Sequence, residues 1–322
     1  MKRYFLPLGA LLLAGVARAD TITIPLPPPT PLNGADVTGT DSGAVGVPAN
    51  LQAFVATKRS ADYSDDEIRA LGQSVSFPYE LLDAPLHRYV DKTGAVYYLK
   101  LKGDNDLATF ARAVALADLT QFPTFSVPVS ATDPSKGMGV DRNPELTFWV
   151  NAYNGLRLKA ISDAYPTIGK EFFRKLDGEK NQIVAGKRYS FAEMRAKIAG
   201  MDPRALFLLM TGTKDGPAAP VEAARYSTLN SAMDRAVRFF INDLSKVGSP
   251  DRIANSVEVS PFLVSVDGFF RPQDSRRKLA GVRQLLSLYT ANSAARGYFT
   301  VSDYTINPSL GNGSLNEQIS PR

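Results

Sequence analysis

Cysteine is absent from this chain of 322 residues, and histidine occurs only once, as His87. Without thiols the chain forms no disulfide, has no cysteine nucleophile and offers no cysteine for a lipid anchor. A single imidazole in a chain without thiols also excludes the Cys/His clusters that hold structural zinc. We therefore predict no metal site and no cofactor for this protein.

A Ser-His-Asp triad would have to use His87, because the chain has no other imidazole. The Gly-x-Ser-x-Gly turn that presents a nucleophilic serine in many hydrolases does not occur either. We therefore expect His87 to lie at the surface or at a helix end, without a catalytic role.

Long apolar runs are also scarce. Residues 5–16 are mostly apolar, but a helix of these 12 residues would span only ~18 Å of the ~30 Å hydrocarbon core of a membrane. Lys2 and Arg3 precede the run, and Ala17 and Ala19 place small residues where a signal peptidase cleaves. This pattern predicts a signal peptide at residues 1–19, cleavage after Ala19, a periplasmic or secreted location and no transmembrane segment.

The positive charge of the chain belongs largely to this signal. The full sequence has 37 Lys+Arg and 32 Asp+Glu, and removal of Lys2, Arg3 and Arg18 leaves 34 against 32, a net charge of +2. Such a balance does not favour nucleic acid as a partner. We expect the partner to be an unidentified ligand or protein of the cell envelope.

Composition divides the remaining chain into three parts. Residues 20–50 are rich in Pro, then in Gly, Thr and Ser, which predicts a disordered linker. Residues 51–310 contain the periodic apolar segments of a single domain, and residues 311–322 are expected to be a flexible tail. The mature chain of 303 residues (322 minus 19) is long enough to bury a core without disulfides.

Apolar periodicity within the domain predicts a helix-rich α+β fold with a small, mostly antiparallel sheet. Ser64 with Glu67 and the segment after Ser190 have the pattern of capped helix starts. We expect helices over residues 107–119, 145–165, 190–198, 228–244 and 275–295. We expect strands over residues 96–101, 182–185, 257–263 and 298–304, and a buried segment of either type over residues 204–210.

Two asparagines interrupt the apolar face of the longest predicted helix. Asn151 and Asn154 are three residues apart, so their side chains lie side by side on one face. Buried amides need hydrogen-bond partners. These two either brace a neighbouring segment of the chain or line a ligand pocket.

The segment from Glu145 to Asn154, ELTFWVNAYN, resembles the signature of the domain of unknown function 547 family, which occurs in exported bacterial proteins. Further motifs follow the family's order over a core of residues 85–307. They are Gly94 to Tyr98, Asp202-Pro203-Arg204, Leu208 to Pro217, Tyr226, Phe239-Phe240, Val259 to Phe262 and Asp267. Several motifs in order make the resemblance more specific than one motif would.

The chain departs from the family pattern at positions that matter for chemistry. Gly216 stands where the family usually has a cysteine, and Leu206 stands where it usually has a histidine. Arg195 is the nearest match to a usual glutamate, and the closing aromatic motif is altered around residues 303–305. A cysteine and a histidine form the pair that a thiol nucleophile needs, so the resemblance implies a hydrolase-like site that this chain has lost.

We therefore predict a non-catalytic exported envelope protein that binds a ligand or partner through the degenerate family site. The candidate ligand-binding residues are Trp149, Asn151, Tyr153, Asn154, Arg204 and Lys214. Arg204 and Lys214 are the ones that could hold an anionic group.

Two alternatives stay open. The first is a hydrolase of peptides, esters or glycans with a non-cysteine catalytic set, for which Asp215 is the candidate. The second is a purely structural partner of another exported protein. A run of basic residues is interpreted as a solvated helix face; it comprises Arg271, Arg276, Arg277, Lys278 and Arg283.

Overall fold

The computed structural model describes residues 56–72, 77–122, 125–128 and 138–319. The predicted signal peptide, the predicted linker and the first residues of the predicted domain lie outside these residues, as do residues 320–322. Within the described ranges, no helix combines the length and the apolar character that crossing a membrane requires.

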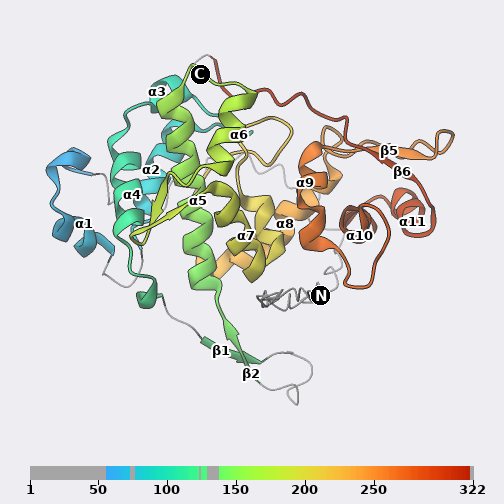
Figure 1. Ribbon diagram of the computed structural model, residues 1–322, viewed down its shortest axis with the longest axis horizontal. Coiled ribbons are helices and arrows are strands. Elements are labelled where there is room, and N and C mark those ends of the chain that lie inside the picture. The colour runs from blue at the N-terminus through green and yellow to red at the C-terminus, as the bar shows by residue number, and fades with distance from the viewer. Residues whose placement is uncertain (1–55, 73–76, 123–124, 129–137, 320–322) are drawn as a thin grey trace, which may run out of the picture.

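Five helices from the first half of the chain pack side by side (Figure 1). They are α1 (Asp65–Gly72), α2 (Glu80–Tyr89), α3 (Tyr98–Leu101), α4 (Asn105–Leu116) and α5 (Asn143–Ala164). The predicted capping box opens α1, because the Glu67 amide donates to Ser64 Oγ at 3.1 Å and the Ser64 amide donates to the Glu67 carboxylate at 2.7 Å. His87 is exposed in the last turn of α2, as the sequence predicts.

Helix α5 runs through the middle of the molecule and is buried on nearly every side. Phe148, Trp149 and Leu158 have no exposed surface. A helix that is apolar all round requires neighbours on all sides, and α3, α4 and α7 (Phe191–Met201) supply them. The predicted end of this helix before Pro166 is confirmed, since α5 stops at Ala164.

The chain continues through α6 (Lys170–Gly178) and a short hairpin into α7. Ser190 caps α7 with a second capping box, in which its hydroxyl accepts from the Glu193 amide. A 3₁₀-helix over Pro203–Leu208 then forms the buried segment that the sequence leaves undecided between helix and strand. Shorter 3₁₀ turns lie at Ser60–Asp62, Leu119–Gln121 and Tyr226–Thr228.

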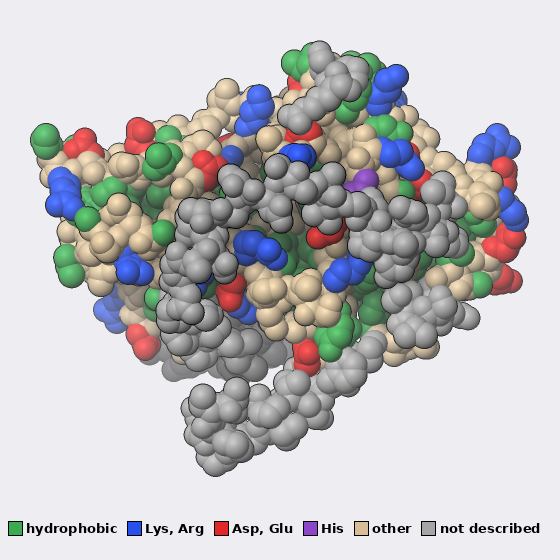
Figure 2. All heavy atoms as spheres, turned by 180° about the vertical axis from the view of Figure 1, so that it is seen from behind, with side chains coloured by type: hydrophobic (Ala, Val, Ile, Leu, Met, Phe, Trp, Pro, Cys, Tyr) green, Lys and Arg blue, Asp and Glu red, His purple; other side chains and the backbone are tan. Residues whose placement is uncertain are grey.

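The second half of the chain forms a neighbouring group of helices (Figure 1). They are α8 (Leu229–Asn242), α9 (Pro261–Phe270), α10 (Ala280–Tyr289) and α11 (Ser293–Val301). Seen from behind, acidic and basic side chains are interspersed over the part of this face where described residues are visible (Figure 2).

The strands are short and pair only two by two. β1 (Phe125–Pro128) pairs antiparallel with β2 (Met138–Asp141), and β3 (Gln182–Val184) pairs antiparallel with β4 (Lys187–Tyr189). β5 (Ser256–Glu258) pairs parallel with β6 (Thr305–Asn307), with Val257 opposite Ile306. The helix-rich α+β class is therefore confirmed, although the strands form separate ribbons instead of one sheet.

Three of the four predicted strands need correction. The strand predicted over residues 96–101 is wrong, because only Val96 forms bridges and α3 begins at Tyr98. The strand predicted over residues 257–263 ends at Glu258, since Ser260 caps α9 and Pro261 occupies its first position. Residues 298–301 of the last predicted strand are helical, and pairing begins only at Thr305.

The single helix predicted over residues 275–295 is also wrong. Leu279 adopts a left-handed conformation (φ 51°, ψ 44°), and α10 begins at the next residue. Asp267 on α9 fixes this start, because its carboxylate accepts from the amides of Gly281 at 2.9 Å and Val282 at 3.1 Å. A second cap at Asn292 then begins α11.

The end of the chain does not follow the prediction of a flexible tail. Residues 310–318 run back over the molecule from β6 toward the first half (Figure 1). The Lys214 amide donates to the Ser314 carbonyl and the Asn316 amide to the Gly212 carbonyl, each at 2.9 Å. Farther along, Val96 exchanges backbone hydrogen bonds with residues 316 and 318. We call residues 310–318 the C-terminal strap.

Candidate functional site

The side-chain amides of Asn151 and Asn154 both bind backbone groups of the protein itself. Asn151 donates to the Ala224 carbonyl at 2.9 Å and accepts from the Ala224 amide at 2.8 Å. Asn154 donates to the Leu208 carbonyl and accepts from the Met210 amide, both at 2.9 Å. Each side chain thus takes the place of a missing backbone partner. Of the two sequence interpretations, the geometry favours bracing over the lining of a ligand pocket.

The two aromatic candidates on α5 belong to the core. Trp149 is completely buried, stands edge-on to Phe148 and Tyr189, and donates its indole N–H to Glu145 at 3.2 Å. Tyr153 is 1% exposed and stands edge-on to Phe191. Neither ring faces an open space that a ligand could enter from the described surface.

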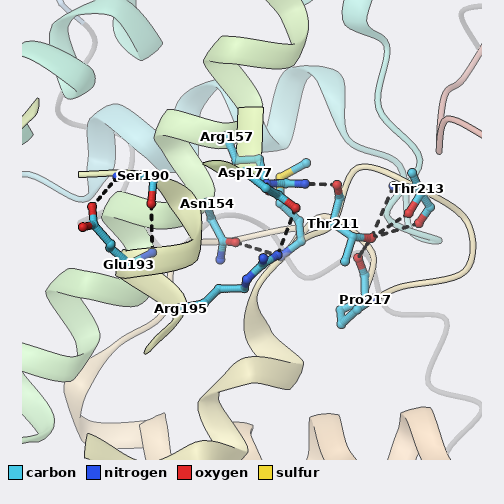
Figure 3. A network of polar contacts seen from close by, with 10 residues as sticks. Asn154, Arg157, Asp177, Ser190, Glu193, Arg195, Thr211, Thr213 and Pro217 are labelled. Carbon is cyan, nitrogen blue, oxygen red and sulfur yellow. Dashed lines mark hydrogen bonds and ion pairs between the residues drawn. The ribbon is translucent and has the colours of Figure 1, made fainter. Parts of the chain in front are cut away.

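A buried arginine that the sequence analysis did not single out organises the centre of this region (Figure 3). The Arg157 guanidinium is 2% exposed, donates to the Thr211 carbonyl at 2.9 Å and pairs with Asp177 at 2.6 Å. Arg195, the nearest match to the family's glutamate, pairs with the other Asp177 oxygen at 3.3 Å. The network ties α5 and α7 to α6 and to the loop after residue 210, which is a structural role.

The two cationic candidates do not join the α5 residues around one cavity. Arg204 is 8% exposed and is held between Asp202 at 2.6 Å and Asp234 at 2.8 Å. Lys214 is exposed on the loop that the C-terminal strap covers. Asp215, the candidate for the hydrolase alternative, is partly exposed beside it, and its carbonyl accepts from the Ser260 hydroxyl.

The two positions at which the predicted resemblance would place a cysteine and a histidine, Gly216 and Leu206, offer no reactive site. A Cβ placed on Gly216 would lie 2.2 Å from the Thr211 hydroxyl, so the threonine already occupies the space of a cysteine side chain. Leu206 is 1% exposed within the apolar core. Packing around Gly216 and Leu206 therefore leaves no space for a ligand at these two positions.

A pocket among the described residues lies elsewhere, between the start of α10 and the chain before and within β6. It has a volume of about 360 Å³. Its lining residues are Lys278, Leu279, Arg283, Asp303, Tyr304, Thr305 and Ile306. None of the six sequence-predicted ligand-binding residues is among them.

Arg283 is the most buried charge in this pocket, with 14% of its side chain exposed. Its guanidinium lies 4.4 Å from the centre of the Tyr304 ring, and its Nη2 group donates to the Tyr304 carbonyl. The Nε–H group donates to the Lys278 carbonyl at 3.2 Å. The third nitrogen, Nη1, is buried and has no partner among the described residues.

Tyr304 also retains a free polar group. The residue is 3% exposed, and its hydroxyl is buried without a hydrogen-bond partner in the described chain. Burial raises the pKa of this phenol to about 12, so it stays protonated at neutral pH. Asp303 differs, because the hydrogen bond from Arg277 at 2.6 Å keeps the pKa of its exposed carboxyl below the ordinary value.

The sequence pointed to part of this pocket without identifying it. The interpretation of the basic run as a solvated helix face is wrong for Arg283, which is mostly buried. The motif at residues 303–305 stands out in the sequence only as a departure from the pattern that the chain resembles. Nothing in the linear sequence indicates that α11 folds the two segments together.

Comparison with known protein families, curated proteins and solved structures finds no match for this chain. The resemblance to the 547 family therefore stays a prediction from its motifs. Within the residues that the structure describes, no group of three or more His, Cys, Asp or Glu side chains could hold a metal ion.

Proposed function

We propose that this protein is exported and acts in the cell envelope as a non-catalytic binding protein. Its binding site is the pocket lined by α10 and residues 303–306, in place of the degenerate family site that the motifs indicate. The proposal rests on the lining of this pocket, in which Arg283 and Tyr304 hold buried polar groups without partners among the described residues.

General acid–base catalysis needs a group whose pKa lies near the working pH. Tyr304 is protonated at neutral pH because its pKa is about 12, and Asp303 is ionised because Arg277 lowers its pKa. No histidine or cysteine lines the pocket. Groups with fixed charge and unused donors suit the recognition of a ligand better than the transfer of a proton.

No comparable observation favours the hydrolase alternative. Within the described residues, Asp215 belongs to no group of three or more metal-ligating side chains and does not line the pocket beside β6. The two carboxyl groups of a glycosidase, by contrast, flank one scissile bond.

The function can be tested by measuring turnover and binding on the same protein. We expect no hydrolysis of peptide, ester or glycan substrates, together with a rise in melting temperature in the presence of ligands that fit the pocket. Turnover by the wild type that disappears in Asp215→Asn would establish the hydrolase instead. Loss of turnover in Arg204→Ala alone would not, because that change also breaks a buried ion-pair cluster.

Export predicts a defined mature chain. When the full gene product is made in cells with a secretory pathway, we expect intact-mass spectrometry of the protein outside the cytoplasm to show a chain that begins at Asp20. The matched control is Ala19→Arg, which removes a small residue from the cleavage site and should leave the precursor uncut. A full-length chain in the cytoplasm from the unaltered gene would contradict this proposal.

A further inference from the structure

We infer that the pocket between the start of α10 and β6 binds the carboxylate or phosphate group of a small organic anion. This inference rests on the proposed binding function and specifies the chemistry of its ligand. Four observations support it: the charge of the pocket, its unpaired donors, its apolar wall, and the unfavourable local conformation and helix position of two residues that line it.

The charge around the pocket is positive. Lys278 and Arg283 line it, and Arg277 reaches it through its ion pair with Asp303. The one carboxylate that lines it, Asp303, is 88% exposed and is hydrogen-bonded to Arg277. Asp303 also lies 3.8 Å from Arg283, so its single negative charge is shared between two arginines. Lys278, also in the lining, makes no ion pair with any described residue. The surplus positive charge attracts an anion into the pocket.

The unused donors are of the kind that an oxyanion satisfies. Arg283 Nη1 carries two N–H groups, and both are buried without a described partner. Buried donors without partners are rare because burial removes their bonds to water. A carboxylate or phosphate oxygen would accept from Nη1 and gain a charge-assisted hydrogen bond.

Tyr304, which also lines the pocket, adds a second unpaired donor. Its hydroxyl is buried, unpaired and protonated at neutral pH, so it can donate to an anionic oxygen. Its ring also lies against the Arg283 guanidinium, which limits the orientations available to that long side chain. The pocket therefore presents its two donors in a preorganised arrangement.

The wall of the pocket sets the size and character of the rest of the ligand. Leu279 and Ile306 contribute apolar surface beside the charged groups. A volume of about 360 Å³ lies at the small end of the range typical of ligand pockets. The site therefore fits a small molecule with one anionic end and an apolar body, rather than a polymer.

Two residues that line the pocket, Leu279 and Arg283, occupy positions that their side chains disfavour. Leu279 adopts a left-handed backbone conformation that leucine disfavours. Arg283 is the fourth residue of α10, near the helix end where the dipole disfavours positive charge. Departures from local preference that gather at one place are characteristic of functional sites. A bound anion would offset the unfavourable position of Arg283.

The inference is tested with three probes that share one aromatic ring, using the mature chain. Benzoate and phenyl phosphate carry an oxyanion, and benzamide has the shape of benzoate without its charge. We expect isothermal titration or ligand-observed NMR to detect benzoate or phenyl phosphate, and benzamide to bind at least about tenfold more weakly. The two anions together show which oxyanion the pocket prefers. Binding should weaken as salt increases.

Four variants locate the binding. Arg283→Gln should weaken anion binding about tenfold or more, since it removes a charge-assisted donor. Arg174→Gln removes the same charge from exposed α6 and should change nothing. Tyr304→Phe should weaken binding a few-fold, as expected for one neutral donor. Tyr98→Phe is its matched control, because the Tyr98 hydroxyl is likewise buried and unpaired but does not line the pocket.

The possible results distinguish a failure of the anion inference from a failure of the proposed binding function. Equal binding of benzamide and benzoate, with both weakened by Tyr304→Phe, would overturn the anion specificity and keep the pocket as a binding site. Binding that is unchanged in Arg283→Gln would overturn the site. No binding of any probe would overturn the inference about the anion, and turnover in the substrate screen would overturn the proposed function as well. Circular dichroism of each variant establishes that it is folded.

Discussion

Replacement of Asn154 by leucine is expected to lower the free energy of unfolding by about 3 to 5 kcal/mol. The side chain is 3% exposed, and its amide makes two hydrogen bonds at 2.9 Å to the backbone of residues 208 and 210. Leucine has a similar size but cannot donate or accept. The Leu208 carbonyl and the Met210 amide would then be left without partners, each at a cost of about 1 to 3 kcal/mol.

Chemical denaturation monitored by the fluorescence of the buried Trp149 measures this effect. Asn151→Leu should be destabilised by a similar amount, because its amide makes the same pair of bonds to Ala224. The matched control is Asn181→Leu at an exposed position, which should change stability by no more than about 0.5 kcal/mol. A loss below 1 kcal/mol in Asn154→Leu would show that water replaces the amide and that the segment around residue 210 is not held by it.

Deletion of residues 311–322 is the second large effect that we expect. It removes four backbone hydrogen bonds, two to Val96 and one each to residues 212 and 214. It also removes the bonds from Asn316 to the Gly94 carbonyl at 2.9 Å and from Tyr165 to Glu317 at 3.0 Å. At about 0.5 to 1.5 kcal/mol for each bond, the loss should reach at least about 3 kcal/mol.

The comparison for this deletion is a chain that lacks only residues 320–322, which keeps every one of these bonds. Thermal unfolding of the two truncated proteins should differ by several degrees, with only the longer deletion lowering the melting temperature. Equal melting temperatures would show that the strap lies on the surface without stabilising it. The pocket should still bind its ligand in the shorter chain if that chain folds, because its lining ends at Ile306.

Features that depend on a few neighbouring residues could be predicted from the sequence. Both capping boxes are of this kind, because Ser64 and Ser190 find their partners three residues away. The long central helix and its end before Pro166 also follow from local apolar spacing and from the geometry of proline. The helix-rich class follows from the sum of such segments.

Features that depend on distant residues could not be predicted in this way. The helix expected over residues 275–295 breaks because Asp267, on another helix, binds the amides of Gly281 and Val282. The two asparagines of α5 predict buried hydrogen bonds, but only the fold identifies their partners as Ala224, Leu208 and Met210. The pocket likewise joins two segments some twenty residues apart, and periodicity carries no information about their meeting.

The C-terminal strap has a consequence for the order of events in folding. The backbone of Val96 is paired with residues 316 and 318, so an edge near the start of the domain finds its partner more than 200 residues later. Contacts of such long sequence separation form late, since closing a large loop costs entropy before any bond compensates for it. During synthesis from the amino terminus, nearly the whole chain must therefore be made before Val96 can pair with the C-terminal strap.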